Sequence, residues 1–497
     1  MDNLDSPKGT ANVDSTIFLN PIPSDSAADS LNWSAFRKWN IMILLGLSTG
    51  VGLSVENFLG NLAPDLYQEF PDEPTSAIHR LLNVIVPMVA PGALIFVSLG
   101  VVYGRRLSLL LSMVILCATS LWAGLTTSFQ SLYAARIIQG LACGPTDALF
   151  LTVIQDCTFV HERGHMLGAV VMLQLALQAA LSIAVTYVTI HTNLRWTFIV
   201  YACLAAFCVV WMFLVMPETR RDRFHQEGRE PTTVAEHHQI RQNLPAMTLK
   251  ESLAAGHTSS NGAGHEFGLL VRQLLIALTR PTNWWCILLT TVTTGAYIGY
   301  CNFFATILIK PPYSWPSANV GLINLTVFPA AFLNWLITGW ASDRMILRYV
   351  RGNTEAILPE YRLIPLLFPA LCAIAGHIGF GCLAEHYLVT NPGGPQAHWF
   401  AMAVISCLQY IGFGGVLEVV LTFLGSTIDP DASLATMTAV TVCRDIAAFG
   451  ISYGTFDFST NVGYAASFGI YAMLIGVLLL GAIPIVIFGV RAQHTVH

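Results

Sequence analysis

Residues 161–165 read His-Glu-Arg-Gly-His, which has the spacing of the zinc-binding motif of metallopeptidases. On a helix, His161 and His165 would share one face and bind the metal, while Glu162 would activate a water molecule. Two observations argue against this chemistry. Gly164 weakens a helix by about 1 kcal/mol relative to Ala, and the sequence offers no convincing third ligand. We therefore expect no metal site and no enzymatic activity, and keep a membrane zinc protease as a remote alternative.

The composition identifies the solvent in which the chain folds. Of its 497 residues, 54% are hydrophobic and only 11% are charged, with a mean hydropathy of +0.60. Soluble domains carry about 25% charged residues, so a chain this poor in charge is expected to fold in a lipid bilayer. The sequence has no Walker-type phosphate-binding run, which excludes direct use of ATP. We expect neither a cofactor nor a nucleic-acid partner.

Hydrophobic runs long enough to cross a bilayer recur along the chain. A membrane helix needs about 20 apolar residues, and twelve runs meet this length. The sequence therefore predicts an all-α integral membrane protein with twelve transmembrane helices, over residues 41–63, 80–100, 107–126, 130–154, 166–190, 196–216, 284–309, 317–340, 363–385, 398–424, 432–455 and 465–490.

The predicted spans divide into two sets of six. A disordered tail (1–36) precedes an N-terminal six-helix half (37–216), and a polar linker (217–282) leads to a C-terminal half (283–490) and a short tail (491–497). Two parallel halves joined by a linker are typical of secondary transporters, whose substrate site lies between the halves near the bilayer midplane.

Positive charges predict the orientation. With the N-terminus in the cytosol, nineteen of the 24 Lys and Arg residues fall in cytosolic segments, three in outer segments and two within spans. Cytosolic loops of membrane proteins are enriched in Lys and Arg, so both termini and the linker are expected to be cytosolic. We further expect a monomeric, multi-pass protein, with the plasma membrane favoured over the vacuolar membrane.

Several short motifs occur in a consistent order and point to a known family. The chain resembles the major facilitator superfamily, and within it the fungal twelve-helix drug:proton antiporter-like branch, over about residues 37–490. The motifs that carry the resemblance are GRRLS (104–108), ARIIQG (135–140), QDCTFVHERG (155–164), PETRR (217–221), KPPYSW (310–315), GWASDR (339–344) and PEYRL (359–363). The resemblance implies alternating-access transport of a small organic molecule, such as a drug, secondary metabolite or organic cation, with protons as the implied coupling ion.

The chain departs from this family's pattern at two places. The family's loop between spans 2 and 3 has Asp and Arg where this chain has Val101 and Val102. The family's fifth helix carries Gly-Pro and further glycines, whereas no Gly or Pro occurs here between Ala169 and Arg195. Both departures weaken the expectation of proton antiport. They leave open a second function, a membrane sensor or degenerate carrier that binds a ligand without transporting it.

Polar residues within the spans are candidates for the transport pathway, because charged side chains are costly at the centre of a bilayer. Removing a carboxylate such as Glu56 from water favours its neutral form, which suits reversible protonation. Arg444 and Asp445 are adjacent, so we expect them to face different directions on their helix. Ordinary structural roles in helix packing remain the alternative for each of the pathway candidates, which are Glu56, Arg136, Gln139, Tyr297, Tyr300, Asn302, Glu418, Arg444 and Asp445.

A second group of polar residues lies at the predicted cytosolic ends of the spans. We expect Asp156 and Glu162 to pair with Arg105 or Arg106, while Asp343 and Arg344 serve the second half. Such pairs would form in one conformation and break in another; the alternative is that the basic loops serve only to set topology. The gate candidates are Gly104, Arg105, Arg106, Asp156, Glu162, Arg163, Asp343 and Arg344.

Overall fold

A computed structural model describes residues 29–159, 162–219, 263–309, 313–345, 359–390, 399–427 and 430–486, together with Pro23, Ser26 and Pro311. His161, most of the predicted tail over 1–36, the tail over 491–497 and residues 220–262 of the predicted linker lie outside the described residues. The described part is helical, and twelve of its helices are long and apolar enough to cross a membrane. The all-α, twelve-span prediction is therefore confirmed.

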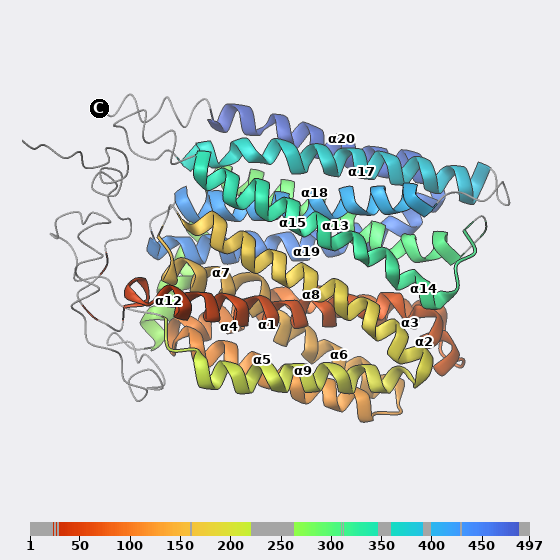
Figure 1. Cartoon of the computed structure of the whole chain (residues 1–497), viewed down its shortest axis with the longest axis horizontal. Helices are drawn as coiled ribbons and strands as arrows, with labels where there is room; N and C mark the ends of the chain where they lie inside the picture. The colour runs from red at the N-terminus through yellow and green to blue at the C-terminus, as the bar shows by residue number, and fades with distance from the viewer. Residues whose placement is uncertain are drawn as a thin grey trace, which may run out of the picture.

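The first six spans are built from nine helices (Figure 1). Two of them, α2 (Ala63–Glu69) and α3 (Thr75–Asn83), lie between the first span and the second. The spans themselves are α1 (Ala35–Asn61), α4 (Ile85–Val102) with the end of α3, α5 (Arg105–Leu125), α6 (Phe129–Cys143) joined to α7 (Pro145–Cys157), α8 (Arg163–His191) and α9 (Leu194–Val215).

The last six spans contain more irregular helix. They are α13 (Pro281–Ile309), the group η3 (Gly321–Thr326), α15 (Val327–Asn334) and η4 (Trp335–Ala341), the group η5 (Pro359–Leu366), α17 (Leu367–Glu385) and η6 (His386–Thr390), α18 (Trp399–Thr427), α19 (Pro430–Val462) and α20 (Tyr464–Leu480). A short α14 (Ser317–Val320) precedes η3. Of these segments, η4 and η6 are π-helical, and η3 and η5 are 3-10 helices.

The fourth span is divided at Gly144 and Pro145, where the sequence predicts one continuous helix. Proline has no N–H to donate and its ring clashes with the preceding turn. Gly144 also lies against the second span, since a Cβ built on it would come 2.1 Å from the backbone nitrogen of Ala93. The break therefore allows α6 and α7 to approach α4 closely.

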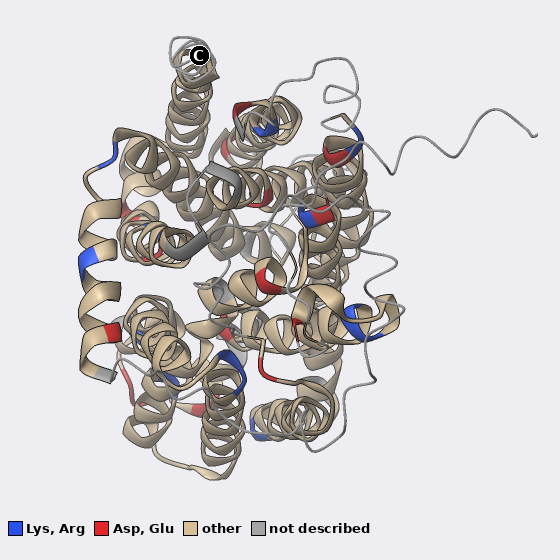
Figure 2. Ribbon diagram, turned by 90° about the vertical axis from the view of Figure 1, so that its left-hand side faces the viewer, with Lys and Arg blue, Asp and Glu red and all other residues tan. Residues whose placement is uncertain are grey.

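One end of the bundle holds the start of α1 and the helix α12 (Ala263–Ala277), and we call it the α12 end (Figure 1). The sequence predicts this end to be cytosolic. Figure 2 views the molecule from this end and shows acidic and basic residues spread over the helix ends and connections there. Within the stretch predicted as a linker, α12 contacts both α4 and α19.

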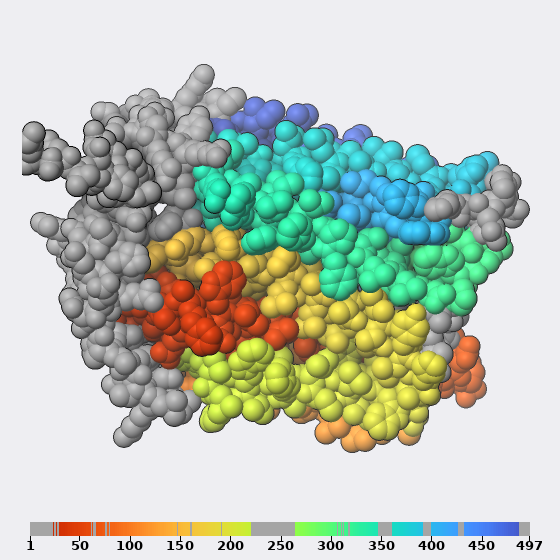
Figure 3. Space-filling model, viewed as in Figure 1, coloured from red at the N-terminus to blue at the C-terminus, as the bar shows by residue number. Residues whose placement is uncertain are grey.

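The two sets of six spans meet along a seam. Helix α4 of the first set packs on α19 of the second, and α8 packs on α15 and η4. Figure 3 shows the second of these contacts at the surface, where the yellow α8 borders the green and teal helices of the second set. The site between the halves is thus enclosed by α4, α8, α15, η4 and α19, with α1, α13 and α18 also contributing to its walls.

Candidate functional site

A cavity lies between the two halves and collects five of the nine predicted pathway residues. Side chains from α1, α8, α13, α18 and α19 line it, and they include Glu56, Tyr297, Glu418, Arg444 and Asp445. The centres of water molecules can occupy about 90 Å³ of this cavity. At about 10–15 Å³ per water centre, it holds a handful of waters in this conformation, so a drug-sized ligand needs the halves to move apart.

Glu418 is the most deeply buried carboxylate of the cavity. Its side chain projects from α18 towards α8 and η4, and the residue is 1% exposed. Neither carboxylate oxygen has a hydrogen-bond partner among the described residues. An isolated ionised carboxylate is very costly to bury, so this geometry favours a protonated Glu418 in the conformation seen.

Arg444 and Asp445 pair with each other, which corrects the expectation that they face different directions. Arg444 Nε and Nη2 both lie 2.7 Å from Asp445 Oδ1, and both residues line the cavity. The argument from helix geometry failed because it places only the Cβ atoms, whereas the long arginine side chain bends back to its neighbour. The pair contributes no net charge to the cavity.

Arg136 and Gln139 lie behind the cavity wall, inside the first half. Arg136 Nη1 donates to Val55 O at 2.9 Å and to Gln139 Oε1 at 3.1 Å, and the residue is fully buried. Its guanidinium lies over the ring of Phe58, with 5.5 Å from Cζ to the ring centroid. Arg136 also interacts electrostatically with Glu56. It can therefore influence the cavity through Glu56 without lining it.

Tyr300 and Asn302 do not line the cavity, contrary to the expectation from their spacing. Tyr300 is buried against α18, where its hydroxyl lies 2.5 Å from Ser406 Oγ, and Asn302 is exposed. The ring of Tyr297 instead stacks on Phe413 at 4.2 Å between centroids and 8° between planes. A three-residue spacing brings side chains near each other but does not place both on the narrow strip that faces a cavity.

Two glutamines in the cavity wall were missed from the sequence. Gln174 and Gln178 of α8 line the cavity, and Gln178 Oε1 has no hydrogen-bond partner among the described residues. Their four-residue spacing within an apolar run was the available signal, because it places two amides on one helix face. The absence of glycine from this run had drawn attention to packing rather than to polarity.

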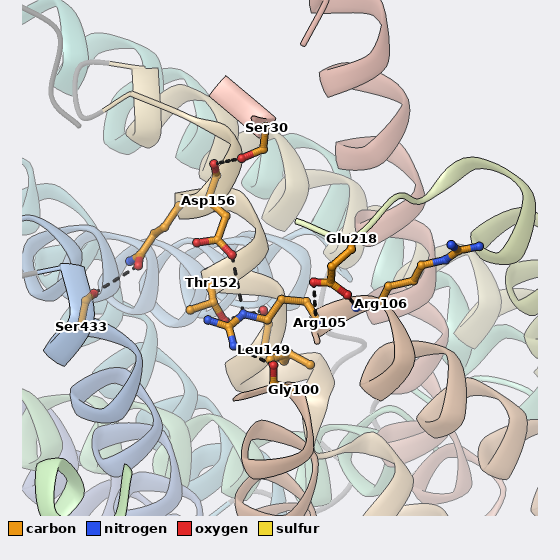
Figure 4. A network of polar contacts seen from close by, with 10 residues as sticks. Ser30, Gly100, Arg105, Arg106, Leu149, Thr152, Asp156, Glu218 and Ser433 are labelled. Atoms are coloured by element: carbon orange, nitrogen blue, oxygen red, sulfur yellow. Dashed lines mark hydrogen bonds and ion pairs between the residues drawn. The ribbon is translucent and has the colours of Figure 1, made fainter. Parts of the chain in front are cut away.

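Glu218 of the PETRR motif caps the start of α5. Its carboxylate accepts hydrogen bonds from the backbone N–H groups of Arg105 at 2.9 Å and Arg106 at 3.2 Å (Figure 4). Gly104 precedes them with φ of +103°, a conformation that favours glycine. A carboxylate at a helix N-terminus satisfies backbone donors and complements the helix dipole. This explains why GRRLS and PETRR occur together in one chain.

Replacing Gly104 with Ala will lower the stability of the first half. A Cβ at this position would lie 2.3 Å from Glu218 Oε2, and the positive φ adds about 1–2 kcal/mol of strain. We expect a clear loss in the thermal unfolding temperature of the detergent-solubilised protein. Gly450→Ala is the matched control, because nothing lies within 4 Å of its added Cβ; equal losses in both variants would contradict the prediction.

Arg105 and Asp156 lie together, but both belong to the first half. Arg105 Nε lies 3.6 Å from Asp156 Oδ2, and Figure 4 shows the two side chains pointing towards each other. Arg106 Nη2 donates to Phe213 O at 2.7 Å, also within this half. Because α5, α7 and α9 belong to one set of spans, these contacts fix helices within a half rather than join the two halves.

Other contacts at the α12 end do cross the seam. Arg163 Nη1 donates to Gly425 O at 2.6 Å, and the N–H of His165 donates to Asp343 Oδ2 at 2.6 Å. Ser433 Oγ donates to Gln155 Oε1 at 3.1 Å. Helix α8 thus begins against a carboxylate of the opposite half, as α5 begins against Glu218.

The remaining gate candidates lie nearby with different surroundings. Arg344 is exposed, with its Cζ 4.0 Å from the ring centroid of Trp340, while Asp343 lies 3.6 Å from Arg362 Nη1. Glu162 occupies the residue before α8. Arg362, in the PEYRL motif, was not among the predicted gate residues, although a buried-side arginine opposite Asp343 is required to compensate that charge.

His165, the second histidine of the opening motif, is packed between aromatic rings. Its ring lies edge-on to Trp39 at 5.6 Å and to Trp335 at 5.7 Å. Within the described ranges, no group of three or more His, Cys, Asp or Glu side chains could hold a metal ion. His161 lies outside the described residues, so the paired ligand geometry of the motif stays a hypothesis.

Comparisons with known proteins agree with this architecture. A protein-family model described as Major Facilitator Superfamily matches residues 44–452. The efflux pump vrtL of Penicillium aethiopicum is 22% identical, covering 91% of this chain and 85% of its own. The MFS-type transporter tndD of Aspergillus flavipes is 23% identical, covering 85% of this chain and 75% of its own.

Solved structures share the fold at low sequence identity. The xylose transporter XylE from E. coli, in a partially occluded inward open conformation, matches with a TM-score of 0.58 at 16% identity and covers 90% of this chain and 97% of its own. The human organic anion transporter MFSD10 matches with a TM-score of 0.57 at 13% identity, covering 90% of this chain and all of its own.

Proposed function

This chain belongs to the major facilitator superfamily and is a secondary transporter, and from this premise we propose that it exports a small organic cation in exchange for protons. The observation that carries the proposal is the charge of the central cavity. Its acidic residues are Glu56, Glu418 and Asp445, and its basic residue is Arg444. Because Arg444 and Asp445 neutralise each other, two carboxylates remain to attract a cation or to bind a proton.

The aromatic part of the wall supports an organic rather than an inorganic cation. Tyr297 and Phe413 form a stacked pair beside the carboxylates, and Tyr410 meets Tyr297 edge-on at 5.5 Å. Aromatic faces attract cations and also bury the apolar surface of an organic ligand. Drugs and secondary metabolites that carry an amine or a quaternary nitrogen combine both features.

The direction of transport rests on two observations. Relatives of this chain include proteins named as efflux pumps of fungi. The contacts of Asp343, Arg163 and Gln155 join the halves at the α12 end. If this end is cytosolic, as the distribution of Lys and Arg predicts, the conformation is closed to the cytosol and suits release of an exported substrate. We place the protein in the plasma membrane, with both termini cytosolic.

A flux assay tests this proposal. The purified protein is reconstituted in liposomes with an imposed pH gradient, and the movement of tetraphenylphosphonium is compared with that of the similarly bulky anion tetraphenylborate. We expect tetraphenylphosphonium to move against its concentration gradient at the expense of the proton gradient, in excess of protein-free liposomes. Equal movement with and without protein would contradict transport of this cation.

The same preparation separates the transporter from the sensor hypothesis. A sensor or degenerate carrier would bind tetraphenylphosphonium, seen as a rise in the thermal unfolding temperature, without any flux. Val101 keeps this alternative in view, because it replaces an acidic residue that the resemblance leads us to expect at the first half's end of the seam.

A further inference from the structure

A small-residue groove at the start of α8 holds two carboxylates of the opposite half. A Cβ built on Gly168 would lie 2.5 Å from Glu418 Oε1, and one built on Gly164 would lie 2.6 Å from Asp343 Oδ1. These glycines are four residues apart, or about 6 Å along the helix axis. A Cβ on Gly339 of η4 would approach both Gly164 O, at 3.1 Å, and Glu418 Oε1, at 3.2 Å. The two carboxylates therefore lie one helical turn apart along one groove.

The groove connects the central cavity with the α12 end. Glu418 lines the cavity at one end of the groove. At the other end, Asp343 accepts the N–H of His165 and lies 3.6 Å from Arg362. Gly164 and Gly168 precede the glycine-free run of α8, so this helix does carry glycines where it approaches the other half. Side chains at either position would fill the space that the carboxylates occupy.

The opposite wall of the groove is the π-helical segment η4. Such segments interrupt the regular helix and are frequent at functional sites. At its start, both amide atoms of Asn334 and the indole nitrogen of Trp335 are buried and have no hydrogen-bond partner among the described residues. Trp335 Cδ1 would lie 3.3 Å from a Cβ on Gly168. Buried polar atoms of this kind are commonly satisfied by water.

We propose that Glu418 binds the proton that drives transport and that the groove between α8 and η4 conducts this proton between the cavity and the α12 end. The inference rests on the proposed proton-coupled function and names the residue and the route. On release, the O–H bond of the Glu418 carboxyl breaks, its electron pair stays on the carboxylate, and the proton passes through water to Asp343 and then to solvent. Uptake from the cavity restores the carboxyl group.

The groups around the groove fit this sequence of steps. Towards the cavity, Glu418 faces Arg444 and Asp445 of α19 and Glu56 of α1. Towards the α12 end, the titratable groups are Asp343 with Arg362 and His165 of α8. The Arg444–Asp445 pair is neutral as a unit, and Arg362 supplies a positive charge beside Asp343 when the latter is ionised. No cation lies as close to Glu418 among the described contacts.

The seam makes the route dependent on conformation. Gly164 and Gly168 belong to the first half, whereas Glu418, Asp343 and Gly339 belong to the second. When the halves separate at the α12 end, the groove widens and water reaches Glu418 from that side. In the closed conformation described here, Glu418 lies at the cavity. One carboxyl group would then exchange protons with opposite sides in the two conformations.

Infrared difference spectroscopy tests the proton site without a substrate. We expect spectra of the purified protein, recorded between about pH 5 and pH 9, to contain the carbonyl stretch of a protonated carboxyl group that Glu418→Gln lacks. Gly168→Ala should shift this band, because its methyl group displaces the carboxylate, whereas Gly454→Ala should not, since nothing lies within 4 Å of its added Cβ. Asp343→Asn should retain the band.

A band of equal amplitude in wild type and Glu418→Gln would overturn the inference, provided that both elute as folded protein on size exclusion. In liposomes, Glu418→Gln and Gly168→Ala should lose pH-driven accumulation of tetraphenylphosphonium, while Gly454→Ala keeps it. Accumulation by Glu418→Gln at the wild-type level would also overturn it. If wild type itself moves no tetraphenylphosphonium, the proposed substrate class fails, and the infrared band still decides whether Glu418 binds a proton.

Discussion

Replacing Asp343 with Ala will separate the two halves at the α12 end and shift the protein towards a conformation open on that side. Asp343 is the residue on which the seam depends most, because it accepts the N–H of His165 across the seam and lies beside Arg362 within its own half. Arg362 is 1% exposed, so removing its partner leaves a buried cation without compensation. Breaking one side of such a pair costs about 3–5 kcal/mol.

This energy exceeds the few kcal/mol that usually separate two conformations of a transporter, so the open conformation should become the major one. The measurement is the distance between spin labels at Phe36 of α1 and Ile364 of η5, both exposed and on opposite halves. The labels require a background from which the eleven native cysteines have been removed. We expect a longer distance in Asp343→Ala than in the parent protein.

Asp156→Ala is the matched control for this experiment. Asp156 is also a carboxylate at the α12 end and lies 3.6 Å from Arg105, but that pair belongs to one half. Its loss should lower stability without changing the distance between the labels. If both variants lengthen the distance equally, the contact of Asp343 with α8 does not hold the seam closed.

Replacing Arg136 with Ala will destabilise the first half and abolish transport. Arg136 is fully buried, donates to Val55 O of α1 and to Gln139, and provides the positive charge near Glu56. Removing it leaves a buried carbonyl without its donor and a carboxylate without a nearby cation. Loss of one partner from such a buried arrangement costs about 3–5 kcal/mol.

Thermal unfolding and flux, measured on the same preparation, check this prediction. Arg195→Ala is the control, because Arg195 lies 3.2 Å from Glu69 with 40% of its side chain exposed. A surface pair of this kind contributes about 0–1 kcal/mol, so its loss should change little. If Arg136→Ala retains the stability and flux of Arg195→Ala, the buried arginine has neither a structural nor a transport role.

The spans could be predicted from the sequence because their signal is local. Twenty apolar residues in a row indicate a membrane helix wherever they occur, and Glu56 and Glu418 could be assigned to the pathway because carboxylates are rare at that depth. The direction in which Arg444 and Tyr300 point could not be predicted. It depends on how a side chain bends and on which neighbour fills the next position, and both are set by packing between helices distant in sequence.

The roles of glycine were also out of reach. The sequence shows which positions in α8 lack a side chain, but a glycine becomes meaningful only when its contact is known. Gly164 and Gly168 acquire a role because Asp343 and Glu418, from 175 or more residues away, occupy the space beside them. The interpretation of the fifth span as glycine-poor concerned its later turns, whereas the contact with the other half is made by its first two.

Helix α12 has a mechanical consequence for the whole molecule. It touches α4 and α19 at once, and these helices belong to bodies that must rock against each other during a transport cycle. Phe267 and Leu275 on its outward side are 50% and 62% exposed, as expected of a helix that rests at a lipid surface. The connector between the two bodies is thus a tether with a fixed anchor at the membrane. It limits how far the mouth can gape, so changes in the leaflet beneath it would be felt as changes in turnover.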